Sequence, residues 1–214
     1  MKSSCLSMGI TLKFMLLRRN LMKQIIIFFC LIISSTISYA VLIDGIEFPD
    51  GEASFADEVV SYAPGSDVGG IYIDPESALG VPDWSSETDI GIVSLGDGGE
   101  LILRFTNNFL TTSGNSDTDL WIFEVGNSIE KFNVAISIDG IDWIDVGDVV
   151  GSVSGVDIDA ISEVVAGELY SYVRLLDIAP NQSGFPFGEA DIDAVGAIST
   201  VINDLIFKDN FDTP

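Results

Sequence analysis

Apolar and polar residues alternate with a period of two between residues 132 and 138. This period is typical of a strand with one buried face, because successive side chains of a strand point to opposite sides. Asp139-Gly140 follows directly and favours a tight type I′ turn, whose two central residues need positive φ. A second strand over 141–147, which carries Trp143, completes a predicted antiparallel hairpin.

Short apolar segments with turn formers between them recur along the rest of the chain. Strands are predicted near residues 91–95, 100–106, 119–125, 131–138, 141–147, 155–160, 169–178 and 191–199. No amphipathic segment is long enough for a major helix, and residues 55–62 fit either a short helix or a strand. This series of short strands predicts an all-β fold, an antiparallel β-sandwich or jelly roll.

The first 40 residues have the character of an export leader. Basic residues precede the apolar run 25–33, and small residues at 38–40 suit a cleavage site. The run is shorter than the roughly 20 residues that cross a bilayer, so no stable membrane span is expected after cleavage, and an uncleaved anchor is the alternative. A compact signal would also begin at Met22. The predicted organisation is a leader over 1–40, a sandwich domain over 41–200 and a tail over 201–214.

Charge and missing residue types exclude several kinds of chemistry. The leader takes five of the nine basic residues, so four remain beside 33 acidic residues, and the formal charge beyond residue 40 is −29. Such a surface repels nucleic acid and anionic lipid. The chain has no histidine, and its two cysteines, Cys5 and Cys30, lie in the leader. Ser-His-Asp, Cys-His and ordinary zinc sites are therefore excluded from the domain.

Aspartates spaced two residues apart are candidate metal ligands. They occur as Asp117/Asp119, Asp157/Asp159 and Asp191/Asp193. On a strand, two such residues share a face at about 6.5–7 Å. Burying two unpaired carboxylates costs free energy, and a Ca²⁺ ion coordinated by their oxygens would remove that penalty. The alternative is that each pair faces water on the outer side of its strand.

The pair Asp191/Asp193 lies among small and apolar residues in segment 190–198, which indicates a central, buried strand. Asp177 ends the preceding apolar segment, and the loop that follows it can bring it alongside the pair. The sequence therefore predicts a Ca²⁺ site built from Asp177, Asp191 and Asp193. A salt bridge from Arg174 to one of these acids is the alternative.

Asp117 and Asp119 are the second predicted set of Ca²⁺ ligands. They follow the polar loop 107–116, which is rich in amide and backbone oxygens, the donors that a hard cation prefers. No EF-hand loop is present, so this expectation rests on composition rather than on a complete motif.

Aromatic residues in loops are the candidate ligand-binding residues. They are Tyr72 and Trp84 in the loop-rich first third, and Phe185 and Phe187 in the late loop. Exposed aromatic rings can stack on sugar rings, whereas the alternative for each is burial in the core. Trp121 and Trp143 lie in predicted strands and are assigned to packing.

Several phrases carry a resemblance to known families. Ser137-x-Asp139-Gly140-x-x-Trp143 resembles the hairpin of discoidin-like domains in the galactose-binding-like group. Other phrases resemble secreted bacterial surface proteins of the PEP-CTERM-associated type: Phe55-Ala-Asp-x-Val-Val-x-Tyr62, Ala78-Leu-Gly-x-Pro-Asp83, Ser94-Leu-Gly-x-Gly-Gly-x-Leu101, Asp119-Leu-Trp-Ile-Phe-Glu124 and Ala190-Asp-Ile-Asp-Ala-Val-Gly-Ala-Ile198. The resemblance implies a galactose-binding-like β-sandwich and surface association or ligand binding. The chain departs from both groups. It lacks the sorting tail of the PEP-CTERM proteins and the cysteines that bracket many discoidin domains.

These observations together predict a secreted, non-catalytic binding module, stabilised by Ca²⁺, for a carbohydrate or an extracellular matrix polymer. One alternative is a structural component of an envelope or biofilm that has no small ligand. Another is an acid–base glycoside hydrolase, which needs two carboxylates about 5–9.5 Å apart. Nucleic acid is not expected as a partner, a periplasmic destination stays open beside an extracellular one, and the oligomeric state is undetermined.

Overall fold

The computed structural model describes residues 39–85, 91–126, 130–178 and 184–202. Every described residue belongs to one compact unit that begins at Ser38. The predicted leader lies outside the described residues except for its last two positions, and so does the predicted tail beyond residue 202. The described strands run from Val41 to Ile202.

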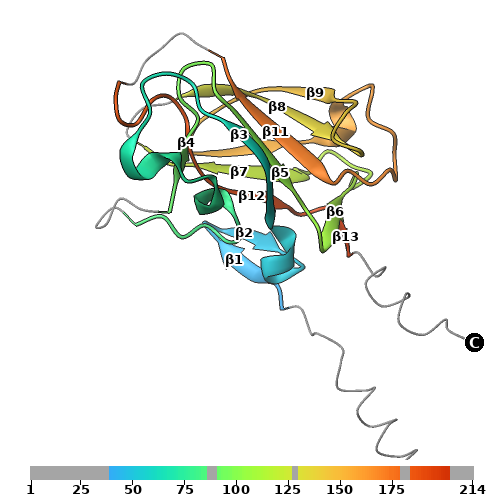
Figure 1. Cartoon of the computed structure of the whole chain (residues 1–214). Coiled ribbons are helices and arrows are strands. Elements are labelled where there is room, and N and C mark those ends of the chain that lie inside the picture. The colour runs from blue at the N-terminus through green and yellow to red at the C-terminus, as the bar shows by residue number, and fades with distance from the viewer. Residues whose placement is uncertain (1–38, 86–90, 127–129, 179–183, 203–214) are drawn as a thin grey trace, which may run out of the picture. The chain divides into compact units, whose positions relative to one another are not determined.

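Five strands form one main sheet, in which all neighbouring strands are antiparallel (Figure 1). In spatial order they are β3 (Glu58–Ala63), β5 (Glu100–Arg104), β11 (Tyr172–Asp177), β8 (Lys131–Ser137) and β9 (Ile144–Val150). Val173, Leu175 and Asp177 are buried along β11, whereas the residues between them are partly exposed. The period of two therefore places the Asp177 carboxylate on the face that carries the core residues.

Four strands form the second main sheet, again entirely antiparallel. In spatial order they are β10 (Val153–Val156), β7 (Leu120–Glu124), β12 (Asp191–Ala197) and β4 (Val93–Ser94). Two short antiparallel pairs are β1 (Val41–Ile43) with β2 (Ile46–Phe48), and β6 (Asn108–Leu110) with β13 (Thr200–Ile202). In the described part of the chain the helices are short 3₁₀ turns, η1 (Gly51–Ser54), η2 (Gly70–Ile73), η3 (Pro75–Ala78) and η4 (Ile158–Ala160).

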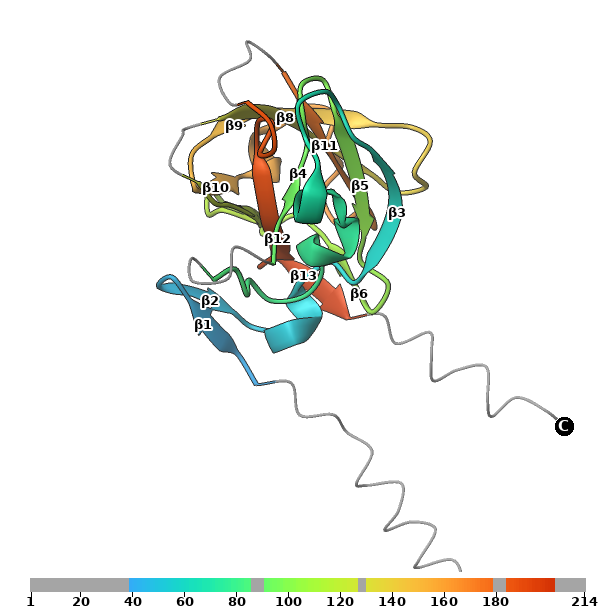
Figure 2. The same ribbon diagram turned by 60° about the vertical axis from the view of Figure 1, so that its left-hand side comes forward.

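The two main sheets pack face to face around one apolar core (Figure 2). Leu103 of β5 and Leu175 of β11 belong to the same buried cluster as Ile122 of β7 and Ile192 of β12. Each such side chain contributes about 1.5–3 kcal/mol relative to full exposure. The predicted all-β class, an antiparallel β-sandwich, is confirmed.

A second, smaller core covers the outer face of β12. Phe48 and Phe55 pack against each other and against Phe123 of β7. The ring centroids of Phe48 and Phe55 are 4.6 Å apart, and those of Phe55 and Phe123 are 6.2 Å apart. A Cβ on Gly196 would lie 2.7 Å from both Phe48 and Phe55, so only glycine allows this close approach. All residues of β12 are buried as a result, which confirms the predicted central, buried strand.

The β8–β9 hairpin is present, but the predicted type I′ turn is wrong. Gly140 has a φ of 74°, whereas Asp139 is not among the residues with positive φ, and β9 begins at Ile144 instead of 141. The Asp139 Oδ1 atom accepts hydrogen bonds from the backbone N–H groups of Ile141 and Asp142, at 2.8 and 3.0 Å. An aspartate that binds the following backbone in this way builds a longer loop than the Asp-Gly pair alone suggested.

One further strand boundary differs from the sequence expectation, and the structure decides one segment that the sequence left open. The predicted strand over 155–160 is wrong in its second half, because η4 begins at Ile158, where the Asp157 side chain accepts a hydrogen bond from the Asp159 N–H at 3.0 Å. The segment 55–62, which fitted a helix or a strand, contributes most of β3. An aspartate at a helix start competes with strand pairing by binding its own backbone.

Asp139 gives a test of the hairpin. The N–H groups of Asp142 and Ile141 lower the pKa of Asp139, so its stabilising contribution is present at neutral pH and is lost as the pH falls through the folded-state pKa. We expect Asp139→Ala to lower the thermal midpoint at pH 7, and the difference from wild type to vanish toward pH 2. Melting followed by circular dichroism across this range checks it, with the exposed Asp142→Ala as control. An equal deficit at both pH values would contradict this account.

Candidate functional site

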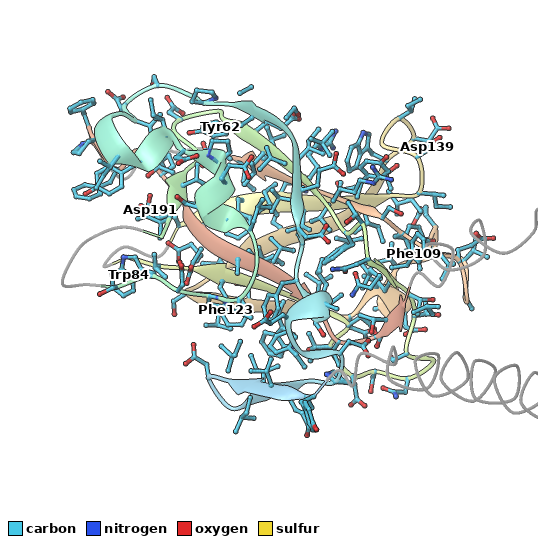
Figure 3. The ribbon with its side chains drawn as sticks, turned by 60° about the horizontal axis from the view of Figure 1, so that its bottom comes forward. Tyr62, Trp84, Phe109, Phe123, Asp139 and Asp191 are labelled. Atoms are coloured by element: carbon cyan, nitrogen blue, oxygen red, sulfur yellow. The ribbon has the colours of Figure 1, made fainter. Side chains whose placement is uncertain are left out.

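Three loops meet at the end of the sandwich where β12 begins. Gly65 donates its N–H to the Leu95 carbonyl at 2.9 Å, and Gly96 donates to the Gly188 carbonyl at 2.6 Å. A Cβ on Gly65 would collide with the backbone of Asp97, so the glycine permits the loops to pack backbone against backbone. Trp84 and Asp191 lie toward this end of the domain, whereas Asp139 lies at the other (Figure 3).

Aromatic residues from two of these loops form a small cluster at this end. The rings of Tyr72 and Phe187 have centroids 4.8 Å apart; Tyr72 is buried and Phe187 is exposed. The Phe185 ring covers Gly69, where a Cβ would lie 2.6 Å from it, and Phe185 itself remains 70% exposed. A large apolar ring held at the surface in this way is available for contact with a ligand.

Trp84 lies on a neighbouring loop that β12 holds in place. The Asp193 Oδ1 atom accepts hydrogen bonds from the N–H groups of Asp83 and Trp84, at 3.0 and 3.3 Å. The Trp84 side chain is 36% exposed. Burial raises the pKa of Asp193 to about 6, against the lowering effect of these two N–H groups. The acid thus acts as a backbone anchor for the tryptophan.

An open pocket of about 540 Å³ lies beside these aromatic residues. Its lining includes the exposed Ile71 and Ile73, the polar side chains of Asp74 and Ser77, and the glycines Gly70 and Gly91. Gly70 follows the residue that Phe185 covers, and Gly91 packs against Asp83 and Trp84. The structure therefore places the four predicted ligand-binding aromatics at one end of the sandwich, near a partly apolar pocket whose described lining includes none of them.

Acidic residues are unusually often buried in this domain. The buried acids of the described chain are Asp119, Glu124, Glu130, Asp177, Glu189, Asp191 and Asp193. The described cations form ion pairs with other, partly exposed acids: Arg104 with Glu58 at 3.0 Å, Lys131 with Asp148 at 2.7 Å, and Arg174 with Glu100 at 3.9 Å. Arg174 also lies over the Trp143 ring, 5.0 Å from its centroid. Arg174, the predicted alternative partner of the acids near β12, is thus placed beside Glu100 and Trp143.

Asp177, Asp191 and Asp193 are all buried, but each has its own neighbours. Burial raises the pKa of Asp177, whose Oδ2 atom accepts the Gly98 N–H at 2.8 Å while Oδ1 has no hydrogen-bond partner. Asp191 accepts a hydrogen bond from the Ser94 hydroxyl. A register shift between Ile192 and Ala194 interrupts the simple alternation of β12. Such a bulge re-aims side chains, so spacing by two does not put both aspartates in one setting.

Asp119 groups with the Asp157/Asp159 pair rather than with Asp117. One carboxylate oxygen from each of Asp119, Asp157 and Asp159 lies within 4.8 Å of the others, whereas Asp117 is exposed. The two Asp119 oxygens accept the N–H groups of Ser113 and Ile158, each at 3.0 Å. The Asp159 Oδ2 atom binds the same loop, through the Ser113 hydroxyl and the Gly114 N–H, at 3.0 Å each. These acids tie the loop before β7 to η4.

Glu124 and Glu130 are buried acids that the sequence analysis did not single out. Glu124 ends β7, is 1% exposed, and neither of its carboxylate oxygens has a hydrogen-bond partner among the described residues. Burial, together with the charges of the nearby Glu130 and Asp191, raises the pKa of Glu124 to about 8, against the lowering effect of the Asp191 backbone N–H. The signal was present in β7, where Leu120, Ile122 and Glu124 are spaced by two and so continue one inward face.

Comparison with known proteins finds similar solved structures, among them the following two. The C-terminal domain of a chitobiase from Bacteroides fragilis is 16% identical with a TM-score of 0.40, and the match covers 71% of this chain and 97% of that chain. CpGH89CBM32-6 produced by Clostridium perfringens is 14% identical with a TM-score of 0.36, covering 68% of this chain and 94% of that chain. No protein-family model matches the chain, and no curated protein matches its sequence. Similarities at this level carry no inference about the ligand.

The described residues contain no helix long and apolar enough to cross a membrane.

The aspartates at 117 and 119 form a matched pair for a stability test. Asp119→Ala leaves the buried Ile158 N–H and the more exposed Ser113 N–H without their acceptor, so we expect a loss of roughly 1–3 kcal/mol in the free energy of unfolding. Asp117→Ala removes an exposed side chain and should change it by less than about 0.5 kcal/mol. Urea denaturation measures both. Equal losses for the two variants would rule out the assigned anchoring role of Asp119.

Proposed function

We propose that this protein is a secreted, non-catalytic module that binds carbohydrate at the end of its sandwich where β12 begins, with Ca²⁺ as a stabilising ion. The observation that carries the proposal is the exposed Phe185 ring, with the exposed Phe187 and Trp84 and a partly polar pocket at the same end of the sandwich. The export leader in the sequence supports secretion to the surface or beyond. A glycan or matrix polysaccharide is the partner that this chemistry favours.

The arrangement suits a sugar because it combines flat apolar rings with polar groups at fixed positions. Phe185 and Trp84 offer ring faces, while Asp74 and Ser77 supply a carboxylate and a hydroxyl in the pocket wall. The loops that carry the rings are held by backbone hydrogen bonds, including Gly69 N–H to the Pro186 carbonyl at 3.2 Å. Rings held in place before binding lose little conformational entropy when a ligand arrives.

The pocket chemistry favours binding over hydrolysis. A glycoside hydrolase needs two carboxyl groups that flank the scissile glycosidic bond. One acts as the general acid and the other as the base or nucleophile. Asp74 is the acidic residue in the described lining of this pocket. Buried acids at the same end interact with other parts of the protein. Asp193, for example, accepts hydrogen bonds from the backbone N–H groups of the Trp84 loop.

Removal of the exposed rings tests the carbohydrate proposal. We expect the wild-type chain to bind at least one polysaccharide on a glycan array, and Phe185→Ala and Trp84→Ala each to weaken binding about tenfold, or about 1.4 kcal/mol. Ile141→Ala, which removes an exposed apolar side chain from the β8–β9 loop at the other end, is the control. Affinity electrophoresis on the best glycan measures the change. Absence of glycan binding would favour a structural role in an envelope or matrix instead.

The burial of acids supports the Ca²⁺ part of the proposal. Buried carboxylates repel one another, and the described cations are paired with other acids. Carboxylate oxygens are the ligands that Ca²⁺ prefers, so the ion would offset both the repulsion and the desolvation.

Melting with and without Ca²⁺ checks this part. A ligand at about 100 times its Kd adds about 2.7 kcal/mol, which corresponds to a thermal midpoint about 5–10 °C higher for a domain of this size. We expect this increase on adding Ca²⁺ to chelator-treated protein, and a smaller increase with Mg²⁺. The same midpoint in Ca²⁺ and in chelator would refute Ca²⁺ stabilisation.

A further inference from the structure

Glu124 has two buried acidic neighbours at the edge of the main core, Glu130 and Asp191. Glu124 ends β7, Glu130 immediately precedes β8, and Asp191 begins β12. Ile192 of β12 is the register partner of Glu124, and the Val125 N–H donates to the Asp191 carbonyl at 2.9 Å. The negative charges of Glu130 and Asp191 both raise the pKa of Glu124, and the Glu130 carboxyl lies within hydrogen-bonding range of it. The group thus involves both main sheets, since β8 belongs to one and β7 and β12 to the other.

Glu124 is the residue that the fold leaves unexplained. Its side chain is 1% exposed, and neither carboxylate oxygen has a hydrogen bond of normal geometry among the described residues. The Asp191 backbone N–H lowers the pKa of Glu124, but this effect is smaller than that of burial and of the two acidic neighbours, which raise it. Glu130 and Asp191 beside it are buried as well. A buried carboxylate without a donor is costly, and acidic neighbours increase the cost. Buried polar groups are otherwise satisfied in folded proteins, so the arrangement indicates a missing positive group.

We propose that Glu124, Glu130 and Asp191 bind one hard divalent cation, with Ca²⁺ as the best fit. This assignment rests on the proposed Ca²⁺ stabilisation and supplies its location. Three carboxylates offer about six oxygens, within the range of about six to eight that Ca²⁺ takes. The set contains no nitrogen or sulfur donor, which disfavours zinc and copper. A bound ion would fasten the ends of β7, β8 and β12 together across the two sheets.

The site is distinct from the aspartate cluster around Asp119. The Asp119 oxygens already accept two backbone N–H groups, and Asp159 accepts two further hydrogen bonds. Those acids are satisfied by the chain itself, whereas Glu124 is not. The main rival at Glu124 is one proton shared with the neighbouring Glu130, which neutralises the pair without an ion.

Calorimetric titration of the full chain with Ca²⁺, after treatment with chelator, tests the assignment. We expect wild type to bind, and Glu124→Gln and Glu130→Gln each to lose one site or to weaken it roughly tenfold or more, because each removes a charged ligand. Glu168→Gln changes an exposed acid and should bind like wild type. Asp119→Asn should retain the site that Glu124→Gln removes.

A second measurement separates loss of the site from loss of the fold. In chelator, Glu124→Gln should be at least as stable as wild type in urea, because it removes a buried charge that lacks a partner. Addition of Ca²⁺ should then stabilise wild type but not the variant. If wild type binds no Ca²⁺, the ion proposal fails altogether and the shared proton takes its place. If wild type binds and Glu124→Gln binds equally well, only this location is overturned.

Discussion

The burial of negative charge is the constraint on which this sandwich depends. Carboxylates occupy positions that the strand period turns inward or that the loops cover, in a chain whose described cations are paired elsewhere. Most of these acids are compatible with burial because backbone N–H groups reach them, as at Asp119 and Asp193. Hydrogen bonds to the charged form offset part of its desolvation, so the acids act as anchors for loops. Glu124 differs from them, because neither of its carboxylate oxygens has a hydrogen bond of normal geometry among the described residues.

Strand β12 connects the two cores, the buried acids and the aromatic loops. Ile192 and Val195 enter the main core, whereas Ala194 packs in the smaller core of phenylalanines. Asp191 lies beside Glu124, and Asp193 holds the loop of Trp84. The aromatic loops at this end are therefore held by the centre of the fold. The proposed ion at the start of β12 would steady these loops without touching the proposed ligand.

Part of the candidate site could be predicted from the chain and part could not. Loop position indicated Tyr72, Trp84, Phe185 and Phe187, and the structure gathers them at one end, although Tyr72 is buried against Phe187. The spacing of aspartates indicated acids of interest but not their neighbours. Asp119 is joined by acids 38 and 40 positions further along the chain, through a contact that only the packing of η4 creates. Strands of three residues, such as β1 and β6, are too short to show a period.

The sequence by itself determined the class of fold, since alternation with a period of two and frequent turn residues leave little choice but antiparallel sheets. It also determined that residues 39–202 contain neither histidine nor cysteine, so chemistry that needs those side chains is not carried by them. The tertiary structure decided which acids are neighbours, which aromatic rings stay at the surface, and that Glu124 is buried without a hydrogen bond of normal geometry among the described residues. These outcomes depend on contacts between residues far apart in the chain, whereas periodicity and turn chemistry are local.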